Sequence, residues 1–147
     1  MTLAYVGFGS NLGERERTIR EAARALRVRR LSALRETEPW GVTDQPLYLN
    51  AVGELETDVP PRDLLERLLE VERSQGRVRR ERWGPRTLDL DLLLYGEVEL
   101  DEPGLTVPHP WLHERAFVLE PLAELAPDLN VPGKGRVRDL LAKLQSA

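Results

Sequence analysis

One segment in the second half of the chain carries most of the information about the fold, and it reads Thr87-Leu88-Asp89-Leu90-Asp91-Leu92-Leu93-Leu94-Tyr95. Leucine alternates with aspartate over its first part, a period of two residues that is typical of a strand with one face on a core. On such a strand Asp89 and Asp91 project from the same face with their Cα atoms about 6.6 Å apart, while the leucines between them point to the core. The following Gly96 is expected to end the strand.

The segments that precede this strand supply three further strands and two helices. β-forming residues predict strands at 3–8, 31–37 and 47–57, and apolar spacings of three and four residues predict amphipathic helices at 14–30 and 63–75. The order βαββαβ predicts an α+β protein with a ferredoxin-like core. In that core an antiparallel four-stranded sheet carries both helices on one face and leaves the other face available for a site.

The part of the chain after Gly96 predicts a C-terminal extension of the core. We expect a short strand near 97–100, a proline-rich stretch at 103–110, a helical segment from about 112 to 125 and a last helix near 137–144. The sequence contains no internal repeat and no linker, so we expect a single domain over residues 1–147.

The composition is that of a globular protein. Of the 147 residues, 41% are hydrophobic and 31% are charged, and no apolar run approaches the ~18 residues that span a bilayer. We expect a cytoplasmic protein without membrane contact, and a monomer as the default for a domain of this size. The chain has no cysteine, which excludes disulfides and thiolate metal sites, and only His109 and His113 could supply imidazole, so zinc chemistry is not expected.

A cluster of positive charge stands immediately before the two aspartates. Six arginines and one glutamate lie between Arg73 and Arg86, in a chain whose net charge is -4. The forked guanidinium of arginine suits phosphate oxygens, and neighbouring carboxylates suit Mg²⁺. Residues 77–91 could therefore bind both the phosphates and the metal of a magnesium polyphosphate. The simpler alternatives are a solvated arginine-rich face and an amphipathic strand whose aspartates bind nothing.

A second candidate pocket is aromatic. Residues 37–41 with Tyr48 and Asn50 could surround a flat heterocycle, for which Asn50 offers both a donor and an acceptor. The alternative is ordinary packing of Trp40 and Tyr48 at the end of the sheet. The sequence contains no GxxxxGK[ST] loop, kinase signature or nucleophile elbow, so a nucleotide site would need another architecture and a covalent intermediate is not expected.

Several of these motifs together resemble one enzyme family. The segment Arg82-Trp83-Gly84-Pro85-Arg86-Thr87-Leu88-Asp89-Leu90-Asp91-Leu92-Leu93 resembles the signature of the 6-hydroxymethyl-7,8-dihydropterin pyrophosphokinases. The likeness continues through residues 9–13, 44–46, 48–50, 75–79, 105–109 and 115–117.

The resemblance implies transfer of the pyrophosphoryl group of ATP to the hydroxymethyl oxygen of the pterin, with release of AMP, for folate biosynthesis. It implies two Mg²⁺ ions held by Asp89 and Asp91. The catalytic residues that it implies are Arg77, Arg79, Arg82, Arg86, Asp89 and Asp91.

The resemblance also implies two sets of binding residues. Those on the ATP side are Glu72, Arg77, Arg79, Arg86, Leu92, Leu105, Thr106, His109 and Arg115. Those on the pterin side are Thr37, Pro39, Trp40, Gly41, Tyr48, Asn50, Trp83 and Phe117, with Tyr48 and Phe117 expected to sandwich the ring. For His109, a role in loop packing stays open as the alternative.

Two interpretations from other classes also stay open. A ferredoxin-like sheet can present aromatic and basic side chains to nucleic acid, and a domain of this kind can also bind a small molecule without catalysis. The net charge of -4 and the two aspartates oppose the first interpretation, so ATP and the pterin are expected as partners and nucleic acid is not.

Overall fold

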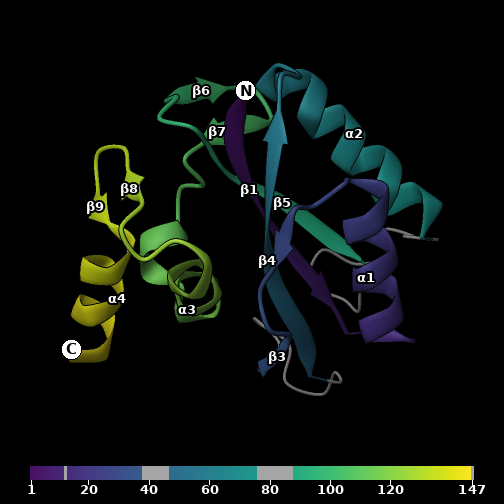
Figure 1. Ribbon diagram of the computed structural model, residues 1–147, viewed down its shortest axis with the longest axis horizontal. Coiled ribbons are helices and arrows are strands. Elements are labelled where there is room, and N and C mark those ends of the chain that lie inside the picture. Colours follow the sequence, from purple (N-terminus) through teal and green to yellow (C-terminus); the bar gives the residue numbers. More distant parts are fainter. Residues whose placement is uncertain (12, 38–46, 76–87, 147) are drawn as a thin grey trace.

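The computed structural model describes residues 1–11, 13–37, 47–75 and 88–146. A central sheet separates two groups of helices, with α1 (Arg15–Ala25) and α2 (Pro61–Ser74) on one side and α3 (Ala116–Leu125) and α4 (Val137–Ser146) on the other (Figure 1). The second group belongs to the C-terminal extension, which therefore packs on the sheet.

Antiparallel pairing connects all strands of the central sheet. The strands are β1 (Thr2–Ser10), β2 (Arg30–Leu31), β3 (Arg35–Thr37), β4 (Tyr48–Thr57) and β5 (Asp89–Tyr95). β1 lies between β4 and β5, while β2 and β3 pair one after the other with the far edge of β4. An antiparallel sheet combined with helices confirms the predicted α+β class.

The first helix is shorter than the sequence predicts, because the chain leaves it through an arginine in the left-handed region. Arg27 has a φ of 58°, Val28 donates its backbone N–H to the Ala23 carbonyl at 3.0 Å, and Arg27 donates to Arg24 at 3.1 Å. These bonds form a Schellman motif, which glycine usually ends. The sequence has no glycine here, so the predicted end near residue 30 is wrong.

The predicted strand at 31–37 is two strands, because one extra residue lies between them. Leu31 pairs with Gly53 and Arg35 pairs with Asn50, so four steps on this edge match three steps on β4. Such an insertion is a β-bulge, which takes a backbone group out of the ladder. The N–H of Ala33 donates instead to the Glu124 carboxylate of α3, at 3.0 Å from Oε2.

The alternation in β5 is confirmed over its first half. The alternating leucines at 88, 90 and 92 are buried against α1 and α2, while Asp91 is exposed. From Leu92 to Tyr95 every residue is buried, because α3 covers the opposite face at this end of the sheet. The prediction that the whole second face is available for a site is therefore wrong for this half.

Two hydrophobic cores hold the layers together. The first joins the sheet to α1 and α2 through residues such as Phe8, Ile19 and Leu68. The second joins the sheet to the extension, with Leu93 of β5 packed among Leu119 and Leu122 of α3. Each fully buried leucine of this kind contributes about 1.5–3 kcal/mol by leaving water.

The C-terminal extension has more elements than the sequence predicts. It contains β6 (Leu100–Glu102), β7 (Leu105–Val107), a 3₁₀ turn η1 (Leu112–Glu114), α3, β8 (Asn130–Val131), β9 (Gly135–Arg136) and α4. The strand expected near 97–100 is the hairpin β6–β7, whose turn contains Gly104 at a φ of 75°. The helix expected from 112 is broken at Arg115, which has an extended backbone.

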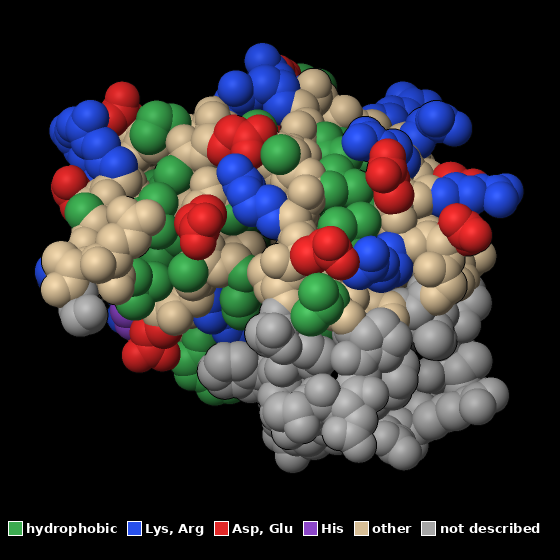
Figure 2. Space-filling view, turned by 90° about the horizontal axis from the view of Figure 1, so that it is seen from below, with side chains coloured by type: hydrophobic (Ala, Val, Ile, Leu, Met, Phe, Trp, Pro, Cys, Tyr) green, Lys and Arg blue, Asp and Glu red, His purple; other side chains and the backbone are tan. Residues whose placement is uncertain are grey.

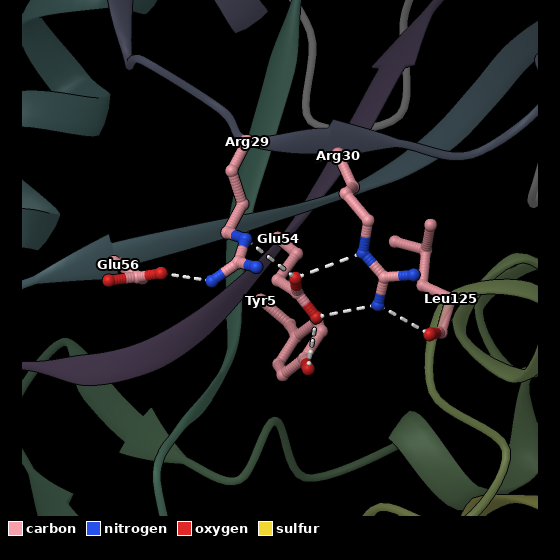
Figure 3. A network of polar contacts seen from close by, with 6 residues as sticks. All are labelled: Tyr5, Arg29, Arg30, Glu54, Glu56 and Leu125. Atoms are coloured by element: carbon pink, nitrogen blue, oxygen red, sulfur yellow. Dashed lines mark hydrogen bonds and ion pairs between the residues drawn. The ribbon is translucent and has the colours of Figure 1, made fainter.

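A row of polar residues crosses the sheet beneath the end of α3 (Figure 3). Glu54 of β4 is 3% exposed, and its carboxylate accepts hydrogen bonds from Tyr5 Oη at 2.6 Å and from Arg30 at 3.0 and 3.1 Å. Arg30 also donates to the Leu125 carbonyl at 2.6 Å. The bonds from Arg30 keep the pKa of Glu54 below its usual value although burial opposes this, and burial raises the pKa of Tyr5.

On the face shown in Figure 2, the coloured basic and acidic side chains lie beside one another rather than in separate patches. The ion pairs Arg17 with Glu21 and Arg20 with Glu16, each one turn apart on α1, follow the same pattern. Mixed charges of this kind leave only a weak local field. Among the described residues, no helix is both long and apolar enough to cross a bilayer.

Candidate active site

The end of the second sheet face that α3 leaves uncovered carries a row of polar side chains. Gly9 of β1 lies opposite Asn50 of β4 on one side and opposite Asp89 of β5 on the other. One row further along, Gly7 lies opposite Asp91. Residues that face each other across antiparallel strands project from the same side of the sheet, so the amide and both carboxylates share one face across a glycine floor.

Gly9 sets the depth of this floor. A Cβ atom at this position would lie 3.2 Å from Asn50 Oδ1 and 3.6 Å from the Tyr48 ring. A side chain on residue 9 would therefore push into the two groups that border it. A Cβ on Gly7 would meet only Leu93, at an ordinary 3.6 Å.

Asn50 is held by its neighbour on the edge strand. Its Nδ2 donates a hydrogen bond to Thr37 Oγ1, and Thr37 pairs with Tyr48 in the β3–β4 ladder. All three residues are half-buried. One wall of the site is therefore a fixed group of an amide, a hydroxyl and an aromatic ring.

The two aspartates are suited to a divalent cation. Asp89 is half-buried and Asp91 is exposed on the same face of β5. Among the residues that the structure describes, no group of three or more His, Cys, Asp or Glu comes together. A pair of carboxylates fits Mg²⁺, which commonly takes one or two protein carboxylates and completes its shell with water and phosphate oxygens.

Glu72 of α2 lies against the strand that carries the aspartates. It is 3% exposed, and its Oε2 accepts the N–H of Leu90 at 2.7 Å. Leu90 stands between Asp89 and Asp91, at the outer edge of the sheet. The Glu72 carboxylate therefore binds the β5 backbone between the two candidate ligands.

An aromatic and basic cluster begins at the same edge. The His109 N–H donates to the Leu93 carbonyl of β5 at 2.9 Å. The guanidinium of Arg115 lies 5.3 Å from the centre of the Trp111 ring and 5.5 Å from that of Phe117, both within the range of a cation–π contact. The Arg115 guanidinium therefore contacts both aromatic rings, and we call this pair of contacts the clamp on Arg115.

His109 is a neutral histidine in this cluster. Burial, and to a lesser extent the Arg115 charge, lowers the pKa of His109 to about 4. Its Nδ1 accepts the backbone N–H of Trp111 at 3.3 Å, and the two rings meet edge to face with their centres 6.1 Å apart. These contacts fit the loop-packing role. Because its pKa is low, the imidazole is neutral at pH 7 and adds no charge beside Arg115.

Comparison with known proteins identifies the family. The sequence model described as 7,8-dihydro-6-hydroxymethylpterin-pyrophosphokinase matches residues 5–127. The chain belongs to this pyrophosphokinase family. Two relatives named 2-amino-4-hydroxy-6-hydroxymethyldihydropteridine pyrophosphokinase are similar over nearly their whole length. The one from Pseudomonas aeruginosa is 49% identical over 94% of this chain and 89% of its own, and that from Methylorubrum extorquens is 46% identical over 98% and 94%.

Solved structures with the pyrophosphokinase fold resemble this one. The Plasmodium falciparum HPPK-DHPS A437G structure with STZ-DHP superposes with a TM-score of 0.77 at 14% identity, and the wild-type structure with SDX-DHP with a TM-score of 0.73 at 14%. Both comparisons cover 99% of this chain but only 46% and 44% of the Plasmodium chains. At this identity the likeness shows the fold alone.

The structure brings part of the pyrophosphokinase set together and leaves part of it elsewhere. Thr37, Tyr48, Asn50, Asp89 and Asp91 share the open face. The side chains of Leu92 and Leu105 are buried in the first core, at 5% and 4% exposed, so they do not line this face. Thr106 is exposed on β7 and donates to Asp101 at 3.3 Å.

The remaining residues that the family resemblance implies lie outside the described part of the chain. They are Pro39, Trp40, Gly41, Arg77, Arg79, Arg82, Trp83 and Arg86. Sequence reasoning did not select Trp111, Gly7 or Gly9. Trp111 could have been selected because it is an aromatic residue between two candidate site residues, His109 and Arg115. The alternation of Gly7 and Gly9 in β1 indicates the glycine floor of the site.

Proposed function

We propose that this chain transfers the pyrophosphoryl group of ATP to the hydroxymethyl oxygen of 6-hydroxymethyl-7,8-dihydropterin in folate biosynthesis. The observation that carries the proposal is the similarity to relatives named for this activity, at 46% and 49% identity over nearly the whole length of each chain. In the reaction the hydroxyl oxygen bonds to the β-phosphorus and the bond from that phosphorus to the α-phosphate oxygen breaks. AMP leaves, and the hydroxyl proton is released.

For the pterin we propose a slot between the sheet wall and α3. Tyr48 and Phe117 would stack on the two faces of the ring, and Asn50 Oδ1 would accept from its N–H edge while Thr37 holds the amide in place. Through the family resemblance we add Pro39, Trp40, Gly41 and Trp83 to this side.

For ATP we propose the side of the site that faces β5 and His109. Asp89 and Asp91 would hold two Mg²⁺ ions that arrive with the nucleotide. Bound Mg²⁺ neutralises charge on transferring phosphates and makes a hydroxyl that it contacts more acidic. Through the family resemblance, the residues proposed to bind or stabilise the nucleotide are Glu72, Arg77, Arg79, Arg82, Arg86, Leu92, Leu105, Thr106, His109 and Arg115. Leu92 and Leu105, whose side chains are buried in the first core, would contact it through backbone atoms only.

The protein's contribution to such a reaction is positioning and charge stabilisation. Arg115, held beside Trp111 and Phe117, would offer a positive charge to the phosphates, and the neutral His109 adds no charge of its own. Glu72 keeps the edge of β5 in place between the two carboxylates. No protein nucleophile is needed.

We also propose that the core is ferredoxin-like, that residues 1–147 form one domain, and that the protein is a cytoplasmic monomer. The fold assignment is supported by the strand order β2-β4-β1-β5, with β2 and β3 counted as one interrupted strand. Antiparallel neighbours in this order, with α1 and α2 on one face, are the arrangement of a split βαβ core.

The proposal is tested by following both products of ATP. With Mg²⁺ and 6-hydroxymethyl-7,8-dihydropterin, ATP labelled in its β- and γ-phosphates should lose both labels to the pterin and yield unlabelled AMP. ADP as the product would make the enzyme a simple kinase and overturn the proposal. Pterin or nucleotide binding without turnover would instead favour a binding module.

A further inference from the structure

We propose that Glu124 of α3 is a positioning residue for the pterin, because it ties the strand that forms one wall of the proposed slot to the helix that forms the other. The inference rests on the proposed function and goes beyond it, since Glu124 lies outside the sets of binding and catalytic residues given above.

Both oxygens of the Glu124 carboxylate bind the bulge of the edge strand, and we call this pair of contacts the clasp. Its Oε2 accepts the N–H of Ala33 at 3.0 Å, and its Oε1 accepts from Arg35 Nη2 at 2.9 Å. Ala33 is the point where the strand leaves the ladder, so its N–H has no partner in β4. The other terminal nitrogen of Arg35, Nη1, is buried without a hydrogen-bond partner among the described residues. Glu124 therefore joins α3 to the edge strand through an ion pair with Arg35 and a hydrogen bond from Ala33.

The clasped strand carries the sheet wall of the slot. Arg35 lies opposite Asn50, and Thr37, two residues further on the same face, lies opposite Tyr48. The hydrogen bond from Asn50 to Thr37 joins the edge strand to β4 at this point. A shift of the edge strand relative to α3 would carry Thr37 with it and would disturb the Asn50 amide.

The same helix carries the opposite wall. Phe117 stands seven residues before Glu124, which in an α-helix is close to two full turns, so both side chains lie on one side of α3 about 10.5 Å apart. A flat ring stacked between two walls requires about 3.5–4.0 Å on each side. The bonds of Glu124 to the edge strand are therefore among the contacts that set the distance from Phe117 to the wall of Asn50 and Tyr48.

Other contacts keep α3 folded when Glu124 is changed. Leu119 and Leu122 are fully buried in the second core, and Arg30 still binds the Leu125 carbonyl at 2.6 Å (Figure 3). The ion pair itself is about a third exposed on each side, where such pairs contribute little to stability. Substitution of Glu124 is therefore expected to change the geometry of the slot more than the stability of the protein.

The test compares Glu124→Ala and Glu124→Gln with Glu120→Ala. Glu120 is exposed one turn earlier on the same helix and takes no part in the clasp. For each variant we would measure kcat, the KM of ATP, the KM of the pterin, and the thermal midpoint. Binding of 6-hydroxymethylpterin beside a non-hydrolysable ATP analogue gives a measurement that does not depend on turnover.

We expect Glu124→Ala to raise the KM of the pterin about tenfold, because a wall that is free to shift positions the ring less well, and to leave the KM of ATP within about twofold. Glu124→Gln retains an acceptor for Ala33 and should recover part of the loss, while Glu120→Ala should behave as the native chain. An unchanged pterin KM, or equal losses for both substrates, would overturn the inference. Absence of pterin-dependent AMP from the native chain would overturn the proposed function itself, and the inference with it.

Discussion

Gly9 shows how much of the site depends on the absence of a side chain. It lies between Asn50 and Asp89 across the sheet, and its bare backbone leaves the floor open beside the Tyr48 ring. Its backbone is in an ordinary strand conformation, so glycine is not needed here for its φ. The requirement is space, and space can be tested by adding one methyl group.

We predict that Gly9→Ala raises the KM of the pterin severalfold with little change in the thermal midpoint. The new Cβ would lie 3.2 Å from Asn50 Oδ1 and would have to displace the amide by a few tenths of an ångström. Gly7→Ala is the matched control, because its Cβ would meet Leu93 at an ordinary 3.6 Å. Steady-state kinetics on both variants would contradict the account if Gly7→Ala were the more damaging.

We predict that Trp111→Ala raises the KM of ATP by about two- to fivefold, the range of one partly exposed cation–π contact of roughly 0.5–1 kcal/mol. Trp111 is 55% exposed, so its removal costs little core packing, but it releases one side of the clamp on Arg115. Val98→Ala, at a position 37% exposed away from the cluster, is the control for losing an exposed apolar side chain. An ATP KM that moves equally in both variants would argue against the clamp.

At the scale of the elements, the sequence predicts those whose signals are local. The alternation in β5 and the apolar spacing of three and four residues in α2 both identify their elements from nearby residues. The split between β2 and β3 could not be predicted, since the Ala33 N–H that leaves the ladder finds its acceptor on Glu124, ninety-one positions along the chain. The left-handed Arg27 likewise lacks the glycine that usually marks such an end.

The cover over the second sheet face does have a local signal in the sequence. Leu92 to Tyr95 form a continuous apolar run after the alternation stops, and a run of this kind indicates burial on both faces. The hairpin β8–β9 is not predicted either, although Gly133 lies in its turn and Gly135 begins β9, both at positive φ. For the site, the alternation predicts the common face of Asp89 and Asp91, whereas the place of Asn50 on that same face, Trp111 and the glycine floor depend on strand pairing and contacts that only the fold reveals.

We predict that Glu54→Ala lowers the free energy of unfolding by about 1–3 kcal/mol, the cost of leaving a buried polar partner unsatisfied. Tyr5 Oη would lose its acceptor beneath α3, and Arg30 would keep only the Leu125 carbonyl (Figure 3). Urea unfolding measures the change. Glu56→Ala is the control, because Glu56 also pairs with Arg29 from the same strand but is 43% exposed, and it should cost less than about 1 kcal/mol. Equal losses in the two variants would contradict the role of burial.

At the scale of the whole molecule, the site is assembled from elements that lie far apart in the sequence. β1 supplies the floor, β4 and β5 supply the walls and the carboxylates, and the C-terminal extension supplies the aromatic cluster and α3. The stability of the extension on the sheet is therefore part of the function, and it depends on groups that titrate.

We predict that the stability of the protein falls as the pH is lowered from 6.5 towards 4. The folded state holds the pKa of His109 at about 4, whereas the unfolded chain takes up that proton near 6.5. A depressed folded pKa contributes stability above the unfolded value and loses it as the pH falls through the folded value. The lowered pKa of Glu54 adds a further loss at lower pH, below its ordinary value of 4.5.

Thermal midpoints measured between pH 7.5 and 4.5 test this dependence. In His109→Gln the slope between pH 6.5 and 4.5 should flatten, because residue 109 then takes up no proton on unfolding. His113→Gln is the control, since His113 is the other histidine of the chain. A slope that stays unchanged in His109→Gln would assign the pH dependence to other groups.

The most direct test of the account is the rate of AMP formation by the native chain and by Asp89→Asn/Asp91→Asn, with ATP, Mg²⁺ and 6-hydroxymethyl-7,8-dihydropterin. Both substitutions preserve shape, and Asp91 is exposed, so the variant should stay folded by circular dichroism. The account predicts one AMP per pterin consumed by the native chain and a loss of at least about 100-fold in the variant. A folded variant that forms AMP at near-native rates would contradict the assignment of this sheet face as the active site.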